Sequence, residues 1–259
     1  ECNLDDMKKE NVILARRQSG GGTVYHDRGN LNFSLITSKK DLKKEKTIQI
    51  LSSALNTFGI ESIVSKRTDI RINTDKGELK FSGSAFKQTK DQGFHHGTLL
   101  VNSHLKNLTK CLKVSEKFET KAIPSVRSHT INLSQLNSNI TIDRLKKSLV
   151  ESFENFHGKS SKFLSLSENE IDEKIEQTLF YKKMISDHWI YGETPKFYKS
   201  FEYKDQVINI EFKSCRVTGF FSPSLKMKDS IKDEWRERFV GKSYSSGLFL
   251  EIVDFFKRI

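Results

Sequence analysis

Three consecutive glycines, Gly20 to Gly22, constrain this 259-residue chain more than any other feature of its sequence. They lie between two apolar segments, Val12 to Arg16 and Leu31 to Thr37, that are typical of β-strands. Glycine adopts positive φ at little steric cost, so a glycine run between strands predicts a turn whose N–H groups can converge on a phosphate or carboxylate. For a glycine triplet taken alone, a flexible hairpin loop is the alternative.

Strand and helix patterns follow one another along the next 140 residues, which predicts an α+β fold. One helix is expected from Ile48 to Phe58, with Gly59 as its left-handed C-terminal cap. A second is expected from Ile142 to Phe156, ending at Gly158. Further strands are expected at Asp69 to Ile72, Leu79 to Ser82 and Phe94 to Val101.

The pattern changes near Ser167, which predicts a second and smaller α+β domain. Ser167 and Glu170 have the capping-box spacing for a helix that carries Ile171, Ile175 and Leu179. A turn, a hairpin from Phe197 to Ser214, a helix around Trp235 and a final amphipathic segment are expected after it. We therefore predict a catalytic domain over 1–183, a linker over 184–195 and an accessory domain over 196–259.

Composition narrows the class of protein without naming a partner. Hydrophobic residues make up 36% of the chain and nineteen are phenylalanine, which favours a folded core over disorder. Cys2, Cys111 and Cys215 are widely separated, so neither a disulfide framework nor a zinc site is indicated, and a reducing compartment fits. The net charge of +11 favours an acidic partner such as nucleotide phosphates, nucleic acid, a membrane surface or an acidic protein.

Cationic and imidazole side chains accompany the glycine loop. Arg17 offers a planar, permanently charged fork suited to phosphate oxygens. Lys80, on a predicted strand before a turn of small residues, can neutralise charge on a transferring phosphoryl or acyl group, although an exposed strand lysine is the alternative. His95 and His96 are adjacent on a strand and face opposite sides, so joint metal ligation is not expected, and His96 is predicted to be structural or to line a pocket.

Three segments in order resemble the lipoate–protein ligase and lipoyltransferase family. Residues 16–27 read RRQSGGGTVYHD, residues 80–85 read KFSGSA and residues 95–100 read HHGTLL. Supporting similarities are GNLN at 29–32, RTDI at 67–70, SVRS at 125–128 and WIYGETPKF at 189–197. Together these segments span almost the whole chain, and the family places a further strand before Glu1, so we expect a fragment or processed form.

The resemblance implies a mixed β-sheet packed with helices, as in the biotin and lipoate ligase superfamily, and an enzyme. Lipoate would react with ATP, with Mg²⁺ as cofactor, to give lipoyl-AMP. The lipoyl group would then pass to a lysine of an acceptor, either a lipoyl domain of a 2-oxoacid dehydrogenase complex or the glycine-cleavage H protein. Transfer from preformed lipoyl-AMP or a lipoylated donor, without ATP activation, stays open. We expect a monomer that uses neither nucleic acid nor a membrane as partner.

The resemblance also implies site residues. Lys80 would be catalytic and contact the lipoate carboxylate or the α-phosphate. Asp69 would belong to the adenylate and magnesium pocket. The lipoate site would comprise Lys80, Gly21 and His96. The nucleotide site would comprise Arg17, Ser19, Gly20, Gly21, Gly22, Thr23, Val24, Tyr25, Asp69 and Lys80.

Three alternatives to a lipoate ligase are considered: a thioester-forming transferase, a biotin ligase and a nucleic-acid-binding protein. An acyl-thioester route needs an activated cysteine, and Cys111 lies between lysines that would lower its thiol pKa. A biotin ligase is disfavoured because its Gly-Arg-Gly-Arg loop is missing from the sequence. A basic nucleic-acid-binding protein is the alternative of another class, although no helix-turn-helix or arginine-rich arm is visible. The compartment is expected to be intracellular; the basic charge favours the mitochondrial matrix over bacterial cytoplasm.

Overall fold

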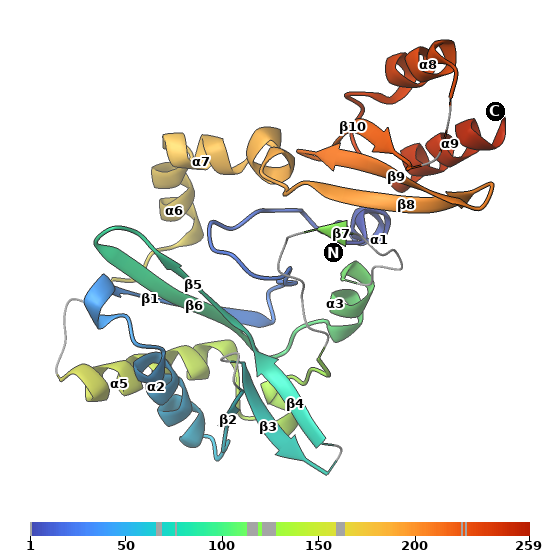
Figure 1. The fold of residues 1–259 in the computed structure, drawn as a ribbon. Coiled ribbons are helices and arrows are strands. Elements are labelled where there is room, and N and C mark those ends of the chain that lie inside the picture. The colour runs from blue at the N-terminus through green and yellow to red at the C-terminus, as the bar shows by residue number, and fades with distance from the viewer. Residues whose placement is uncertain are drawn as a thin grey trace. The chain divides into compact units, whose positions relative to one another are not determined.

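The computed structural model describes residues 2–65, 69–75, 77–112, 119–120, 128–158, 164–223, 225 and 227–259. Internal contacts divide the chain into two compact units, shown as ribbons in Figure 1. Unit 1 comprises Glu1–Ile13, Arg17–Lys113 and Ile123–Ser165. Unit 2 comprises Leu14–Arg16, Val114–Ala122 and Leu166–Ile259.

Unit 1 contains two antiparallel sheets of three strands each. One sheet has the order β1 (Asn30–Ser38), β6 (Gln92–Leu100), β5 (Ser84–Gln88). The other has the order β2 (Ile63–Val64), β3 (Ile70–Thr74), β4 (Gly77–Ser82). Gly83 joins β4 to β5, so the chain passes from one sheet to the other at this single residue.

Two long helices, α2 (Lys44–Asn56) and α5 (Ile142–His157), pack against each other and bury the apolar face of unit 1. Ser148 on α5 donates a hydrogen bond to the carbonyl oxygen of Ala54 at 3.0 Å, so the small side chains allow close packing. The core includes Leu51, Leu55, Ile70, Phe81, Leu99 and Leu145. The shorter helices are α1 (Leu4–Lys9), η1 (Lys39–Asp41), α3 (Leu105–Cys111) and α4 (Leu133–Leu136).

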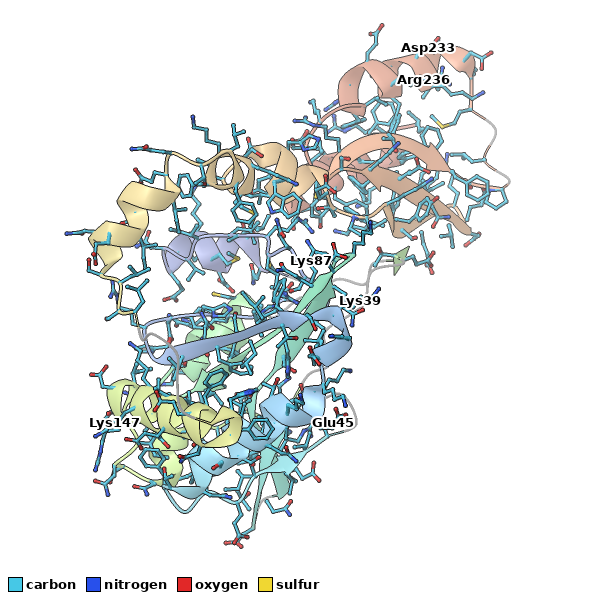
Figure 2. The ribbon with its side chains drawn as sticks, turned by 90° about the vertical axis from the view of Figure 1, so that its left-hand side faces the viewer. Lys39, Glu45, Lys87, Lys147, Asp233 and Arg236 are labelled. Atoms are coloured by element: carbon cyan, nitrogen blue, oxygen red, sulfur yellow. The ribbon has the colours of Figure 1, made fainter. Side chains whose placement is uncertain are left out.

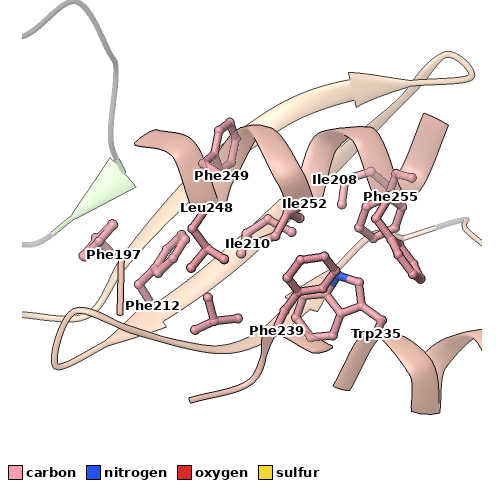
Figure 3. Packing of buried hydrophobic residues seen from close by; sticks show 12 residues of the cluster. Phe197, Ile208, Ile210, Phe212, Trp235, Phe239, Leu248, Phe249, Ile252 and Phe255 are labelled. Carbon is pink, nitrogen blue, oxygen red and sulfur yellow. The ribbon is translucent and has the colours of Figure 1, made fainter. Parts of the chain in front are cut away.

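Unit 2 is built on an antiparallel sheet with the order β10-β9-β8-β7. Its strands are β7 (Glu119–Thr120), β8 (Phe197–Tyr203), β9 (Gln206–Lys213) and β10 (Arg216–Phe221). Its helices are α6 (Glu168–Ile175), α7 (Leu179–Met184), the π-helix η2 (His188–Gly192), α8 (Asp229–Phe239) and α9 (Ser246–Lys257). Figure 3 shows α9 covering β8 and β9, with Phe212, Trp235, Phe239 and Ile252 among the buried side chains.

The structure confirms the α+β class and most of the predicted elements. The helices at 44–56 and 142–157 end as expected, with Gly59 at φ +72° and Gly158 at φ +77°. Ser167 and Glu170 form the predicted capping box. No helix among the described residues is both long and apolar enough to cross a membrane.

Three local predictions are wrong. Residues 12–16 form no strand, because no segment among the described residues pairs with them, and the Ile13 side chain is exposed. Leu179 begins a separate helix, because the chain turns between Ile175 and Thr178. The expected turn after β4 is a single glycine followed at once by strand β5.

The contacts place residues 166–183 with unit 2, and the expected linker at 184–195 includes the π-helix η2. The functional domain boundaries predicted from the sequence stay a prediction.

Candidate functional site

Arg17 holds the glycine loop from within. Its Nε donates a hydrogen bond to Ser19 Oγ at 3.1 Å, and its Nη2 donates to the carbonyl oxygens of Gly20 at 2.9 Å and Gly22 at 2.8 Å. Gly21, between these carbonyls, has φ +103°, which a residue with a side chain rarely adopts. The guanidinium therefore fixes the shape of the loop that the sequence predicts to bind an anion.

The loop is attached to β6 and β5 through side chains. Ser19 is buried, and its Oγ lies 2.6 Å from Nε2 of His96 on β6. Burial, followed by the charge of Arg17, lowers the pKa of His96, so its ring is neutral near pH 7. Beside this contact, Lys87 Nζ on β5 donates a hydrogen bond to Gln18 Oε1 at 2.9 Å. The loop is thus held at Gln18 and Ser19 by two adjacent strands.

Lys80, on β4, and Asp69, immediately before β3, form an ion pair. Lys80 Nζ lies 2.9 Å from Asp69 Oδ1, and Arg71 Nη2 lies 3.6 Å from the other carboxylate oxygen. The side chains of Lys80 and Asp69 are 24% and 13% exposed. The backbone of Lys80 is fixed as well, because its N–H donates to His129 and its carbonyl accepts from Ile131.

An irregularity in the β3–β4 pairing places this ion pair. Ile70 pairs with Ser82 and Arg71 with Lys80, so Phe81 is an extra residue on β4. Such a β-bulge re-aims the neighbouring side chains and is common beside functional sites. Here Ile70 and Phe81 are both buried, while Lys80 stays partly accessible next to Asp69.

Gly83 connects Lys80 to the third motif. A Cβ added at Gly83 would lie 3.2 Å from Lys80 Nζ, so the amine lies directly against this glycine. Gly83 accepts a hydrogen bond from the Thr98 N–H at 3.0 Å and donates one to Thr98 Oγ1 at 3.3 Å. The glycine loop contacts His96 and the Lys80 segment contacts Thr98, so all three motif segments meet along residues 96–98 of β6.

Replacing Gly97 by alanine is expected to destabilise unit 1. The added Cβ would lie 2.6 Å from the carbonyl oxygen of Gly83 and 2.6 Å from a ring carbon of Phe33. Overpacking of this kind costs about 1–3 kcal/mol. Urea unfolding followed by far-UV circular dichroism measures the loss, because both tryptophans, Trp189 and Trp235, lie in unit 2.

Gly219→Ala is the matched control for this change. Gly219 is also a strand glycine, on β10, and nothing lies within 4 Å of its added Cβ. A Gly97→Ala protein as stable as the Gly219→Ala protein would contradict the close approach of Gly83 and β6.

The remaining predicted loop residues, Thr23, Val24 and Tyr25, differ in how far they are exposed. Thr23 is half-buried and Val24 is exposed. Tyr25 is buried; burial and the nearby Asp27 carboxylate raise its pKa, and its hydroxyl bonds Asn107 as well. The Tyr25 side chain therefore packs toward α3 and not into the cluster around Arg17, so any nucleotide contact at this position involves its backbone.

Asp27 supports the exit of the loop. Its carboxylate accepts hydrogen bonds from the N–H groups of Gly29 at 2.9 Å and His104 at 2.7 Å. His26 Nδ1 lies 3.0 Å from Asn30 Nδ2. These contacts give both residues a structural part at the exit of the loop.

Asp69 is arranged as an ion-pair partner. Its two oxygens face the Lys80 ammonium and the Arg71 guanidinium. Among the residues that the structure describes, no group of three histidine, cysteine or carboxylate side chains could hold a metal ion. The carboxylate is thus already bound to two cations, and Mg²⁺ in enzymes of phosphoryl chemistry is held largely by substrate phosphates, so the place of Asp69 in a magnesium pocket stays a prediction.

The thioester alternative meets an obstacle at Cys111. The expected lowering of its pKa by lysines is wrong: burial is the largest influence and raises the pKa of the thiol, and the carboxylates of Glu10 and Asp6 add to it. The thiol is 2% exposed. A buried thiol in its neutral form is a poor nucleophile.

In unit 2, the WIYGETPKF segment at 189–197 is hydrogen-bonded to Arg16. Arg16 Nε donates to the carbonyl oxygen of Ile190 at 2.8 Å and Nη2 donates to Thr194 Oγ1 at 2.7 Å. Trp189 Nε1 donates to the carbonyl oxygen of Arg16 at 2.8 Å. Of the other supporting similarities, residues 67–68 and 125–127 lie outside the described residues.

Sequence reasoning missed three side chains that complete the site. Thr98 lies inside the HHGTLL motif, but nothing in the sequence indicates its bond to Gly83. Arg71 faces Asp69 only because of the β-bulge. Lys87 lies two residues after Ala85, the last residue of the KFSGSA motif, so both side chains lie on the same face of β5. This spacing could have indicated that Lys87 belongs beside the motif.

Comparison with known proteins identifies the class to which this fold and site belong. A family model described as the lipoyl protein ligase A/B catalytic domain matches residues 1–154. A lipoate-protein ligase A of Bdellovibrio bacteriovorus is 37% identical over 98% of this chain and 70% of the relative. A lipoate-protein ligase A of Psychrobacter cryohalolentis is 34% identical over 90% and 73%.

Solved structures agree. LipL1 of P. falciparum, in complex with lipoate, has a TM-score of 0.63 at 30% identity, covering 100% of this chain and 75% of that one. The bi-partite lipoate protein ligase of Thermoplasma acidophilum, studied with its lipoyl domain, has a TM-score of 0.60 at 28% identity, covering 73% and 74%. A lipoate-protein ligase A bound with ATP has a TM-score of 0.57 at 28% identity, covering 73% and 76%.

This α+β chain with its glycine loop is therefore an enzyme of lipoyl-group ligation or transfer. It belongs to the lipoyl protein ligase family, as the sequence resemblance predicts.

Proposed function

We propose that this enzyme activates lipoate with ATP and transfers the lipoyl group from lipoyl-AMP to a lysine of an acceptor protein. The observation that carries the proposal is the convergence of three segments on residues 96–98 of β6. Through it, a glycine loop shaped by Arg17 and a lysine held by Asp69 are fixed on the same short stretch of strand. This arrangement suits one anionic ligand with a phosphate and a carboxyl end.

In the first half-reaction, a carboxylate oxygen of lipoate attacks the α-phosphorus of ATP. A bond from oxygen to phosphorus forms, the bond to the β-phosphate oxygen breaks, and pyrophosphate leaves. Lys80 is the group that neutralises charge on the carboxylate or the α-phosphate oxygens, and Arg17 with the loop N–H groups holds the nucleotide. Asp69 keeps the Lys80 ammonium in place until the ligand arrives, because it lies 2.9 Å from it.

In the second half-reaction, the uncharged ε-amine of the acceptor lysine attacks the acyl carbon of lipoyl-AMP. An amide forms, the acyl–phosphate oxygen bond breaks, AMP leaves and the amine loses a proton. The loop and Lys80 hold the phosphate of the departing AMP. In this reaction the enzyme mainly positions two reactants and balances charge, as the predicted site residues do.

The ligands of the solved relatives support the proposal. One solved relative is in complex with lipoate, another is bound with ATP, and a third was studied with its lipoyl domain. We extend both ligands to this chain, together with Mg²⁺ as the counter-ion of ATP and lipoyl domains and the glycine-cleavage H protein as acceptors. We propose a monomer, located in the mitochondrial matrix of a eukaryote or in bacterial cytoplasm.

Incubation with lipoate, ATP, Mg²⁺ and an apo-lipoyl domain tests the proposal, with lipoyl-AMP supplied in a parallel reaction. We expect lipoyl-AMP and lipoylated acceptor in the first reaction and lipoylated acceptor in the second. Product only from supplied lipoyl-AMP would identify a lipoyltransferase and overturn the ATP-dependent step. Absence of product in both reactions would overturn the proposal as a whole.

A further inference from the structure

A group of lysines covers the edge of unit 1 beside the glycine loop. They come from η1, the start of α2 and the β5–β6 hairpin, which contact one another: the Lys39 N–H donates to the carbonyl oxygen of Asp91 at 2.9 Å, and Lys44 Nζ lies 4.5 Å from the centre of the Phe86 ring. Figure 2 shows Lys39 and Lys87 close to each other on one side of the unit, with Glu45 below them. We call the group the lysine surface; it comprises Lys39, Lys40, Lys43, Lys44, Lys87 and Lys90.

The charges of the lysine surface are only partly neutralised by nearby carboxylates. The described ion pairs involve other lysines, and none of these six pairs with a described carboxylate. Asp41, Glu45 and Asp91 lie among them, which leaves an excess of three positive charges. The pKa of Asp41 is lowered by a hydrogen bond from Ser38 and then by Lys40, Lys46 and Lys43, as expected in a positive local potential.

The lysine surface borders a hollow and is joined to the glycine-loop segment by a hydrogen bond. A hollow here is lined by Leu42, Lys44, Phe86, Lys87 and Gln88. Lys87 borders this hollow and donates a hydrogen bond to Gln18, the residue before Ser19 of the glycine loop. A partner seated on the lysine surface therefore lies next to the loop that is proposed to hold the acyl-adenylate.

We propose that the lysine surface docks the acceptor protein through an acidic face that flanks its target lysine; this inference rests on the proposed function. The interspersed carboxylates of Asp41, Glu45 and Asp91 favour a protein partner, because they would repel the uniform charge of a nucleic acid but can pair with a patterned surface. The hollow bordered by Leu42 and Lys87 offers contact for one side chain of that partner, whereas the two faces of the Phe86 ring are covered by His95 and Lys44. Complementary charge at the rim of an interface raises the association rate and fixes the orientation of the partner.

The test is the triple variant Lys40→Glu, Lys43→Glu, Lys90→Glu, assayed with an apo-lipoyl domain that carries acidic residues around its target lysine. These three side chains are exposed, and no described hydrogen bond or ion pair joins them to a site residue. We expect the acceptor KM at low salt to rise by at least about tenfold, because six units of charge change at the interface. Lipoyl-AMP formation without acceptor is expected to stay unchanged, and added salt is expected to reduce the difference.

Three control experiments separate an effect on docking from other effects of the three substitutions. Lys147→Glu, on the opposite side of unit 1 in Figure 2, is the control for a lysine charge reversal outside the lysine surface and is expected to keep the acceptor KM. An acceptor whose flanking carboxylates are changed to amides is expected to lose the difference between native enzyme and variant. Lys→Gln at the same three positions is expected to give a smaller rise of the same sign, which serves if the triple Glu variant unfolds.

Normal lipoyl-AMP formation together with an unchanged acceptor KM would overturn the docking surface and leave the proposed function intact. If the triple variant lost affinity for a duplex oligonucleotide but kept its acceptor KM, the surface would be a polyanion site and the inference would be wrong. If the native enzyme lipoylated no acceptor from either ATP or supplied lipoyl-AMP, the proposed function itself would fail.

Discussion

Changing Lys80 to methionine is expected to reduce lipoyl-AMP formation by at least about 100-fold, the effect seen when one preorganised charge-stabilising group is removed from an active site. Methionine keeps most of the length of the side chain and removes the ammonium that lies 2.9 Å from Asp69 and against Gly83. The loss is expected mainly in kcat, because charge on the reacting oxygens is greatest in the transition state. Quantifying lipoyl-AMP by mass spectrometry in the absence of acceptor measures this step alone.

The fold is expected to tolerate the change. The Lys80–Asp69 pair is partly exposed, and Arg71 remains 3.6 Å from the Asp69 carboxylate when the lysine is gone. Removing one partner of a mostly buried pair costs more than the about 1 kcal/mol of an exposed pair, but Arg71 stays as a second cation beside the Asp69 carboxylate. Lys80→Ala is expected to act in the same direction, and Lys87→Met, which removes the lysine that is hydrogen-bonded to Gln18 of the loop segment, is the control with a much smaller loss. Unchanged acceptor lipoylation by the Lys80→Met enzyme, from both ATP and supplied lipoyl-AMP, would overturn the catalytic role of Lys80.

Elements with a strong local signal were predictable from the sequence. The helix at 44–56 repeats its apolar residues at 3.6-residue spacing and has Gly59 after its last turn, and β1 alternates Leu31, Phe33 and Leu35 with polar neighbours. In both cases the side chains that determine the element belong to the element itself. Tertiary contacts then agree with the local pattern.

Elements that depend on a distant partner were not predictable. Residues 12–16 have a strand-like composition but no strand beside them, so they stay irregular. Strand β10 follows a two-residue turn, Ser214 and Cys215, with φ values of +52° and +57°. Turns of this geometry usually contain asparagine or glycine, so this sequence gives no hairpin signal.

The candidate site likewise combines local features that the sequence predicts with distant contacts that it does not predict. The sequence indicates which residues carry chemistry, because three glycines, an arginine and a lysine in motif context are local features. It does not indicate the contacts that bring them together: Ser19 with His96, Gly83 with Thr98, and Asp69 with Lys80 join residues 11 to 77 positions apart. These pairings follow from strand register and from the bulge at Phe81, which only the folded chain determines.

His95 makes the stability of unit 1 sensitive to acid. Its ring is 1% exposed and stacks on Phe86 with ring centres 3.9 Å apart, with the edge of Phe33 at 5.8 Å. Neither ring nitrogen has a hydrogen-bond partner among the described residues. Burial, and then the charges of His96 and Lys44, lower the pKa of His95 from 6.5 to about 4. The folded state therefore holds this histidine neutral.

Below pH 6.5 the unfolded chain takes up a proton at His95 that the folded chain refuses until about pH 4. The contribution of neutral His95 is thus complete above pH 6.5 and is lost as pH falls toward 4, which makes unfolding easier by about 2 kcal/mol between pH 7 and pH 4.5. Urea unfolding of His95→Leu at both pH values is expected to show a pH dependence smaller by that amount. His157→Asn, at an exposed position on α5, is the control and is expected to keep the dependence of the unmodified chain. An equal pH dependence in His95→Leu and the unmodified chain would mean that His95 is protonated in the folded state, and the ring would then need a partner near Phe86 that the structure does not provide.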